Sequence, residues 1–323
     1  MTRVLVIGGT AFIGRAMVNQ LLARGDDVTI MHRGHGTPFG DRVREIRCDR
    51  NDVAAVRSTL DGESFQEVYD NVYDWQRGTT ADQVAASARA VASPALRRYV
   101  FTSSIAAYGS GLNHHDNDEL TPADDPNAYA AHKAESERVL FRLQRTEGIP
   151  VTTLRPAFVY GPHNGFEREA WFWDRIVADR PVIVPGDGSR QMQFVHAEDV
   201  ARAGLAAAGR VESKGAAYSL GCNPAITQED LVQKLASAAG KPVRIVRVPR
   251  ERLEAAGGSM FAEPLYFGFF LDPPPMTAAG DGVRNDLGIE LMPLERGFRE
   301  TFAWYQTQQR PRPDFSWEDQ FVQ

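Results

Sequence analysis

The most constraining feature of this 323-residue chain is a glycine-rich turn near its start, Gly8-Gly-Thr-Ala-Phe-Ile-Gly14. The run 3–7 before it is short and apolar, as expected of a buried parallel strand. The segment 13–24 after it has apolar residues at helical spacing and ends before Gly25. Glycines between a strand and a helix let backbone N–H groups approach a pyrophosphate at the positive end of the helix. The turn therefore predicts a dinucleotide-binding unit, and the alternative is a tight structural turn.

Strand and helix patterns alternate over the rest of the first half of the chain. Apolar runs predict strands at 28–31, 43–47, 67–73, 98–102 and 151–154, and helical spacing predicts helices at 53–60, 82–92 and 127–146, the first with Asp52 as its N-cap. Strict alternation implies an α/β fold with a doubly wound parallel sheet of the Rossmann type. We therefore expect a dinucleotide-binding domain over residues 1–160.

The sequence changes in character beyond Tyr160, where loops lengthen and proline and aromatic residues cluster. Helices are predicted at 171–178, 197–208 and 227–239, with strands near Val182, Tyr218 and Val243. We expect a smaller C-terminal α/β substrate-binding domain from 161–192 and 211–323, with 193–210 packing back on the first domain. The loop-rich segment 257–282 is interpreted as a lid, a subunit contact or a buried extended segment.

Composition and charge limit the classes of partner. A formal net charge of −6 and a pI near 5.7 argue against a surface for nucleic acid or an anionic membrane. No apolar run approaches the ~18 residues of a membrane span, and a strand starting at residue 3 leaves no room for a signal peptide. Cys48 and Cys222 lack metal-ligand spacing, as do His114, His115 and Asp116. We expect a cytoplasmic protein that takes a small-molecule substrate and needs no metal, and homodimer formation is left open.

The end of the second predicted strand bears on the choice of dinucleotide. An acidic residue there would accept hydrogen bonds from the ribose hydroxyls of NAD, but this strand ends with Met31, His32 and Arg33. Arg33, together with His32, can pair with a 2′-phosphate through its fork of donors. We predict NADP(H), with NAD still open, and the alternative is a solvated arginine. Asp49, just after the third strand, either accepts from the adenine amino group or caps a turn.

Tyr129 and Lys133 lie four residues apart on the predicted helix 127–146 and therefore on one helix face. A nearby ammonium lowers the pKa of a phenol from about 10 toward the range in which it can transfer protons. Ser104 follows the strand 98–102, and catalytic groups on such sheets gather at the carboxyl ends of strands. We therefore predict that Ser104 orients a substrate hydroxyl or carbonyl toward Tyr129. The competing interpretations are a chance spacing on an exposed helix and a hydroxyl-rich strand end.

Five segments, in chain order, resemble the extended short-chain dehydrogenase/reductase family of NAD(P)-dependent sugar epimerases, dehydratases and reductases. They are GGTAFIG at 8–14, FTSSIAAYG at 101–109, YAAHK at 129–133, LRPAFVYGP at 154–162 and QFVHAEDVA at 193–201. The resemblance implies that Ser104, Tyr129 and Lys133 are catalytic and that residues 155–156 lead past the nicotinamide. The expected cofactor-binding residues are Gly8, Thr10, Ala11, Phe12, Ile13, Gly14, His32, Arg33, Asp49, Ser103, Tyr129, Lys133 and Pro156. The expected substrate-binding residues are Ser104, Tyr108, Arg190 and His196, with a structural hydrogen-bonding role as the alternative for His196.

The GGTxFIG form of the turn and the segment 170–181 resemble an atypical subgroup of this family. The subgroup includes bacterial epimerase-like proteins and the chloroplast stem-loop-binding proteins, which have been associated with RNA. RNA binding on an old enzyme fold is therefore the alternative function. The retained Ser104, Tyr129 and Lys133 and the acidic charge balance favour the enzyme. Ala11 stands where related sequences often have the middle glycine, so the pyrophosphate must tolerate one more methyl group.

Two features bear on the substrate. Nucleotide-sugar members of the family usually carry an arginine that holds the diphosphate where this chain has Met192. Arg190 lies two residues earlier. Arg168 or Arg284 either takes over the role of the missing arginine or is a surface charge. This difference puts a nucleoside-diphosphate sugar in doubt. Aromatic residues either line a pocket for a larger apolar substrate or pack the core of the second domain, namely Trp171, Phe172, Trp173, Phe261, Tyr266, Phe267 and Phe269.

The expected reaction is reduction of a ketone or epimerisation at a secondary alcohol of a sugar-like or other small-molecule substrate. Dehydratases of the family usually carry acidic residues next to the serine, whereas Ile105 follows Ser104 here. Dehydration is therefore the least expected of the three reactions. Net turnover of the cofactor would separate reduction from epimerisation.

Overall fold

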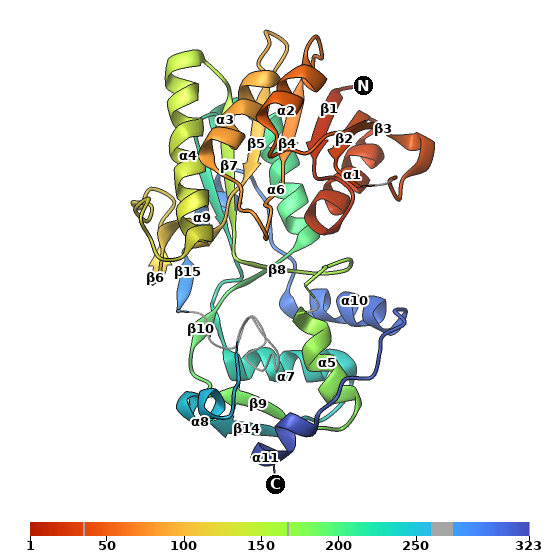
Figure 1. Ribbon diagram of the computed structural model, residues 1–323, viewed down its shortest axis with the longest axis vertical. Coiled ribbons are helices and arrows are strands. Elements are labelled where there is room, and N and C mark those ends of the chain that lie inside the picture. The colour runs from red at the N-terminus through yellow and green to blue at the C-terminus, as the bar shows by residue number, and fades with distance from the viewer. Residues whose placement is uncertain (35, 167, 260–273, 323) are drawn as a thin grey trace.

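The computed structural model describes residues 1–34, 36–166, 168–259 and 274–322 (Figure 1). Its centre is a seven-stranded sheet of order β12-β7-β5-β4-β1-β2-β3, in which neighbouring strands run parallel. The strands are β1 (Arg3–Ile7), β2 (Asp27–His32), β3 (Arg44–Arg47), β4 (Glu67–Asp70), β5 (Arg98–Thr102), β7 (Val151–Pro156) and β12 (Ala217–Leu220). The chain winds outward from β1 in both directions, which confirms the predicted doubly wound α/β fold.

Helices cover both faces of this sheet, because successive strand residues point to opposite faces. Val4 packs with α1 and α6, whereas its neighbour Leu5 packs with the helices of the other face. One face carries α1 (Phe12–Arg24) and α6 (Ala197–Gly209), and the other carries α2 (Val53–Leu60), α3 (Ala81–Ala90) and α4 (Ala128–Glu147). The strand predicted at 67–73 is three residues too long, because β4 ends at Asp70.

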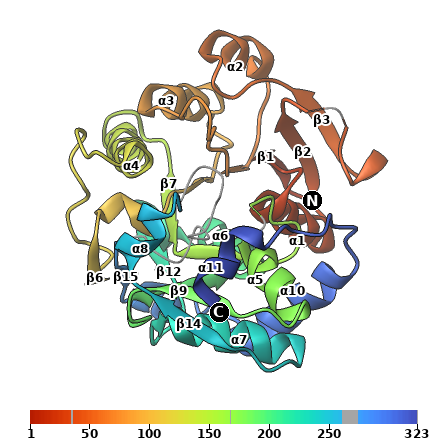
Figure 2. The same ribbon diagram turned by 60° about the horizontal axis from the view of Figure 1, so that its bottom comes forward.

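A second apolar core lies on the other side of β8 from the sheet, between α5, α7 and α10 (Figures 1 and 2). The short strands around it pair as β8 (Phe158–Tyr160) with β11 (Phe194–His196), β9 (Val182–Pro185) with β14 (Ile245–Val248), and β10 (Gln191–Met192) with β13 (Ile226–Thr227). The helices around this core are α5 (Arg168–Val177), α7 (Gln228–Ala239) and α10 (Leu294–Gln306). Two short helices, α8 (Arg250–Ala255) and α11 (Asp319–Val322), pack on β9 and β14 in a smaller cluster, whereas α9 (Asp281–Asn285) packs with β12 in the core of the main sheet. Phe172 and Trp173 are fully buried in this core, as the packing interpretation of these aromatics expects.

The segment 211–323 does not lie wholly in the second part of the molecule. β12, which the sequence analysis assigned to the substrate-binding domain, is an edge strand of the main sheet and pairs with β7. Tyr218 and Leu220 of β12 join the same apolar core as α1 and α6, which explains its place there. α6 packs against α1 in that core, where the sequence analysis expected residues 193–210 to return. The division into a dinucleotide-binding and a substrate-binding domain stays a prediction.

The segment 257–282 is described only in part. Residues 260–273, with Phe261, Tyr266, Phe267 and Phe269, lie outside the described residues, whereas β15 (Met276–Ala278) pairs with β6 (Gly111–His114). Cys48 and Cys222 are both free cysteines. Within the described ranges, no helix combines the length and apolarity needed to cross a membrane.

Candidate active site

The glycine turn folds tightly between β1 and α1. Gly8 has a φ of 84°, a left-handed conformation that favours glycine, and its N–H donates to the carbonyl oxygen of Met31 at 2.9 Å. A Cβ atom added at Gly14 would lie 1.8 Å from the carbonyl oxygen of Gly8. Only a residue without a side chain therefore lets α1 approach the end of β1 this closely.

The N-terminus of α1 has the properties of an anion site. Ala11 is its N-cap and makes no side-chain capping bond, and its first turn contains no acidic residue. Ala11 is exposed with a φ of −138°, an ordinary value for alanine, so its methyl group adds no backbone strain. Backbone N–H groups and the helix dipole favour phosphate oxygens at such an end. The residues present here, Gly8, Thr10, Ala11, Phe12, Ile13 and Gly14, thus fit a pyrophosphate.

Lys133 lies at the carboxyl end of β5, on the first half of α4. Its Nζ donates to the backbone carbonyl oxygen of Thr102 at 2.7 Å and lies 4.8 Å from the centre of the Phe101 ring. The side chain is only 4% exposed, and this burial lowers the pKa of Lys133 to about 8. Beside it, the buried hydroxyl of Ser103 has no hydrogen-bond partner among the described residues, which fits a group that contacts a ligand.

Tyr129 lies one helical turn before Lys133, and its phenol is close enough to Ser104 for that side chain to act on its pKa. Burial raises the pKa of Tyr129, while Ser104 and the positive charge of Arg168 act in the opposite direction. The predicted lowering of this pKa by the neighbouring ammonium is not found, because the Nζ of Lys133 is directed to Thr102 and lies 5.8 Å from the phenol ring centre. Burial is therefore the largest influence on the pKa of Tyr129.

An aromatic cluster that the sequence analysis missed covers Tyr129. Trp75 stacks on the Tyr129 ring, with centres 4.8 Å apart and planes at 23°, and Tyr73 meets it edge-on at 4.8 Å. The hydroxyl of Tyr73 is 3.0 Å from Nδ1 of His132, on the same turn of α4 as Tyr129. Trp75 is 48% exposed, so the cluster faces the solvent side of the site. These residues come from the loop after β4, which carries no familiar motif.

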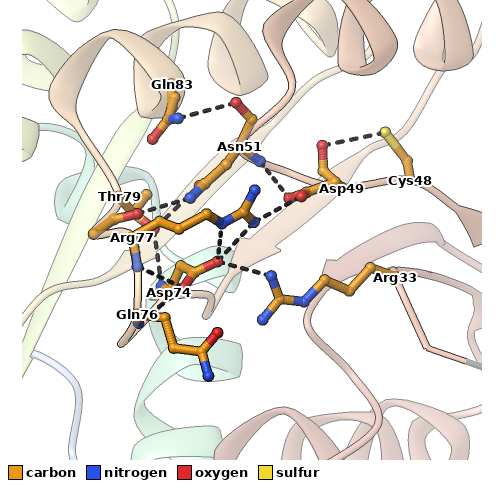
Figure 3. Close-up of polar contacts among 10 residues, drawn as sticks. Arg33, Cys48, Asp49, Asn51, Asp74, Gln76, Arg77, Thr79 and Gln83 are labelled. Carbon is orange, nitrogen blue, oxygen red and sulfur yellow. Dashed lines mark hydrogen bonds and ion pairs between the residues drawn. The ribbon is translucent and has the colours of Figure 1, made fainter.

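A network of charged side chains joins the ends of β2, β3 and β4 (Figure 3). Asp74 is buried, and its Oδ2 accepts from Arg33 at 2.7 Å and from Arg77 at 2.7 Å. Arg77 also reaches Oδ2 of Asp49 at 2.7 Å, so Asp74 and Arg77 link Arg33 to Asp49 through their contacts. The backbone N–H of Arg77 and, against the cost of burial, both guanidinium groups hold the pKa of Asp74 far below its ordinary range.

The structure does not bring His32 into this network. His32 is buried, and its Nε2 is 2.8 Å from a carboxylate oxygen of Glu45. Arg33 is exposed and is the predicted phosphate-binding residue that reaches the network. Asp49 accepts from the backbone N–H of Asn51 at 2.9 Å, the turn-capping role that the sequence analysis held as its alternative. Pro156 is the last residue of β7.

Two of the residues predicted to bind substrate, Tyr108 and His196, make internal contacts. The hydroxyl of Tyr108 accepts from Arg155 at 2.7 Å and contacts Ser219 at 2.9 Å. His196 is 2% exposed and caps α6 through Nδ1, which accepts from the N–H of Glu198 at 3.3 Å. Arg190 is partly exposed, just before β10. The hydrogen bonds of Tyr108 and His196 described here go to groups other than Tyr129.

A cavity of about 160 Å³ lies between α5 and the end of α10. Glu169 lines it, and this side chain is 4% exposed, with Oε1 lacking a hydrogen-bond partner among the described residues. Its other oxygen accepts from Nδ2 of Asn164 at 3.3 Å. Burial raises the pKa of Glu169 to about 7, although the neighbouring Arg168 lowers it. No group of three or more candidate metal ligands occurs in the part of the chain that the structure describes.

The glycine turn, the parallel sheet and the cluster of Ser104, Tyr129 and Lys133 together define the class of extended short-chain dehydrogenases/reductases. Residues 4–221 match the model of the NAD dependent epimerase/dehydratase family, and the chain belongs to this family. This finding confirms the resemblance read from the sequence.

Two relatives and one solved structure show which known proteins this chain is similar to. The chain is 30% identical over 256 residues to the chloroplast stem-loop binding protein of 41 kDa b from Arabidopsis thaliana, covering 74% of this chain and 64% of that protein. It thus spans less than two thirds of the length of this first curated relative. It is 25% identical to a dTDP-4-dehydro-6-deoxy-D-allose reductase of Streptomyces bikiniensis, over 94% of this chain and 95% of that one. The UDP-glucuronic acid 4-epimerase of Bacillus cereus, solved with NAD, shares the fold with a TM-score of 0.72 at 18% identity, over 94% and 98% of the two chains.

Proposed function

We propose that the chain is an NAD(P)-dependent epimerase or reductase that acts at a secondary alcohol or ketone of a sugar-like substrate, with Ser104, Tyr129 and Lys133 as its catalytic residues. One observation carries the proposal. Ser104, whose side chain lowers the pKa of Tyr129, follows β5, and Tyr129 lies one helical turn before the buried Lys133, which is bonded to the end of the same strand. Ligands of such sheets bind at the carboxyl ends of the strands, where the glycine turn also lies.

Each side chain has a defined task in this chemistry. The hydroxyl of Ser104 holds the reacting oxygen of the substrate beside the phenol, and Tyr129 takes up or returns the proton of that oxygen. Lys133 supplies positive charge next to the phenol and is itself held in place by the carbonyl group of Thr102. A bound nicotinamide would supply the hydride acceptor or donor for the carbon atom that bears this oxygen. Trp75, stacked on Tyr129, provides an apolar surface for the face of a sugar ring.

For the cofactor, we propose NADP(H), because the exposed Arg33 follows β2 and no acidic residue takes the place of a ribose acceptor there. The relatives with solved complexes leave NAD as the competing choice, since the epimerase of known structure carries NAD. The charge network supports a role for Arg77 beside Arg33, because both guanidinium groups meet at Asp74. A 2′-phosphate would compete with this carboxylate for the same donors.

The proposal is tested with the purified full-length protein. Its cofactor is released by denaturation and identified by mass spectrometry, and the affinities for NADH and NADPH are then measured by fluorescence titration. The protein is finally incubated with cofactor and a set of nucleotide sugars, and the sugar products are followed by NMR. A new epimer without net change in cofactor indicates an epimerase, whereas oxidation of NADPH indicates a reductase. Failure to bind either dinucleotide contradicts the proposal.

RNA binding is the second candidate function, because one relative is named for stem-loop binding. The net charge of −6 disfavours an extended phosphate-binding surface. Titration with a stem-loop RNA at several salt concentrations separates the two functions. RNA affinity that falls steeply with salt and survives Tyr129→Phe would favour this candidate over the enzyme.

A further inference from the structure

A buried ion pair lies on the sheet face that α2, α3 and α4 cover, the face that also carries Lys133. Arg50 follows β3 and is 3% exposed, and its Nη2 donates to Oδ2 of Asp70, the last residue of β4, which is fully buried. Tyr99 donates from its hydroxyl to the same carboxylate oxygen at 2.6 Å. Among the described residues, Nε and Nη1 of Arg50 and Oδ1 of Asp70 have no hydrogen-bond partner.

Stability alone gives a poor account of this pair. Removing two charges from water costs free energy that their attraction repays only with good geometry and full hydrogen bonding. Here three polar atoms of the pair lack partners among the described residues, so the pair is not fully satisfied. Apolar side chains of similar volume at Arg50 and Asp70 would pack this layer at least as well. A role in the electric field of the site is therefore the better explanation.

The pair belongs to the surroundings of Lys133. Asp70 is the register partner of Phe101 on the neighbouring strand, and Nζ of Lys133 lies 4.8 Å from the centre of the Phe101 ring. Parallel register partners point to the same face of a sheet, so Asp70 lies beside the ring on which the ammonium rests. The negative charge of Asp70 favours the charged lysine, and the positive charge of Arg50 opposes it.

The other ionisable groups around Lys133 do not replace Asp70. Glu137, one turn further along α4, also favours the ammonium, but Arg155 of β7 holds it in a buried ion pair with an Nη2–Oε2 distance of 2.7 Å. Tyr73, after β4, and Tyr129, on α4, present their ring faces to Nζ at 5.5 and 5.8 Å. Tyr99 of β5 contacts Asp70 itself, and His132 is engaged with Tyr73.

We propose that Arg50 and Asp70 are positioning residues that set the charge of Lys133. Asp70 is the counter-charge of the buried ammonium, and Arg50 weakens the effect of this counter-charge. Arg50 then keeps Asp70 from fixing the lysine permanently in its charged form. The proton of Lys133 can leave and return within the working pH range, which suits a residue beside a phenol that exchanges protons. The catalytic consequence rests on the proposed function, whereas the charge relation does not.

The test is an NMR titration of lysine side chains in the full-length protein. The chain has only four lysines, Lys133, Lys214, Lys234 and Lys241, so labelling with ε-¹³C-lysine gives few signals. The signal missing in Lys133→Met belongs to Lys133. In the wild type we expect its midpoint near pH 8, because burial lowers the pKa of Lys133 to about 8.

The two variants of the pair are expected to move this midpoint in opposite directions. Arg50→Gln removes a cation, and the midpoint rises by about one pH unit. Asp70→Asn removes an anion, and the midpoint falls by about one pH unit. Arg98→Met is the matched control, because Arg98 is also 3% exposed but donates to the carbonyl oxygen of Arg210, and it is expected to leave the midpoint unchanged.

Either folded variant decides the question by itself, so loss of fold in one leaves the other as the test. Tyr99→Phe keeps both charges and removes only one hydrogen bond to Asp70, so a smaller rise is expected and gives a third, milder variant. An unchanged midpoint in the folded variants, or shifts of the same sign in Arg50→Gln and Asp70→Asn, overturns the proposal. Cofactor binding and turnover are measured separately, so a failure of the proposed function remains distinguishable from a failure of this charge relation.

Discussion

The ammonium nitrogen of Lys133 lies 2.7 Å from the backbone carbonyl oxygen of Thr102. This bond ties α4 to the end of β5, directly before Ser103 and Ser104. Tyr129, one turn earlier on the same helix, is thereby placed beside Ser104. The arrangement of the three proposed catalytic side chains therefore depends on main-chain atoms of the sheet, and substitutions of single side chains can test it without altering its frame.

Gly14 and Ala11 form a matched pair for testing the glycine turn. A Cβ atom at Gly14 would lie 1.8 Å from the carbonyl oxygen of Gly8, whereas Ala11 is exposed in an ordinary conformation. We expect Gly14→Ala to weaken dinucleotide binding at least about tenfold and to lower the melting temperature, because α1 must move away from β1. Ala11→Gly is expected to bind within about threefold of the wild type. Fluorescence titration with NADH and NADPH makes the comparison, and equal affinities in the two variants would contradict it.

Arg33 is expected to select between the two dinucleotides. Arg33→Ala should weaken NADPH binding by about tenfold, because a charged hydrogen bond to the 2′-phosphate is lost, and should leave NADH binding nearly unchanged. Asp74→Asn should strengthen NADPH binding, because it removes the carboxylate that holds Arg33 and Arg77. Arg89→Ala, at an exposed ion pair with Glu147, serves as the control. Equal losses for NADH and NADPH in Arg33→Ala would count against NADP(H) specificity.

Glu169 is expected to make folding stability depend on pH. Burial raises the pKa of its carboxyl from an ordinary 4.5 to about 7, so the folded state holds a proton that the unfolded chain releases. The stability that the protonated Glu169 contributes to the folded state is fully present below pH 4.5 and is lost as the pH rises through 7. Between pH 5 and pH 8 the wild type should lose about 2 kcal/mol of unfolding free energy relative to Glu169→Gln. Urea denaturation at both pH values measures it, and Glu147→Gln, at an exposed site, should show no such loss.

Trp75 should report on occupancy of the site, because it stacks on Tyr129 and is half exposed. A dinucleotide or substrate that reaches Tyr129 alters the surroundings of this indole, so binding should change the tryptophan fluorescence. We expect the change to be clearly smaller in Trp75→Phe. Trp317→Phe is the control, because Trp317 packs against Phe321 near the end of the chain. An equal change in both variants would show that ligand binding does not reach Trp75.

Local patterns explain why most of the sheet could be predicted. β5 and α2 lie at the predicted residues, since a short apolar run and an Asp52 N-cap are signals within a few positions. The place of β12 could not be predicted in the same way, because its pairing with β7 joins segments that are far apart in the sequence. Helix α10 was not among the predicted helices, although its Phe298 is fully buried in the second core.

The candidate site was predictable where a motif fixes the spacing, as for Tyr129 and Lys133. Asp74 and Trp75 were missed, because they lie on a loop whose course depends on packing against α4. The segment 74–79 does contain a turn signal. An aspartate such as Asp74, which accepts from the N–H groups two and three residues later, is typical of such loops. Tyr108 was predicted to face the substrate, but the buried Arg155 takes its hydroxyl, and no local pattern announces that contact.

The most direct test of the account is the rate of sugar conversion by Tyr129→Phe compared with the wild type. Both proteins are first shown to bind the dinucleotide with similar affinity, so that any difference arises in the chemical step. The wild type should convert at least one nucleotide sugar, and Tyr129→Phe should be slower by a factor of about 10² to 10⁴, because it lacks the proton-transferring hydroxyl. Undiminished conversion by Tyr129→Phe would contradict the assignment of this phenol as the acid–base group.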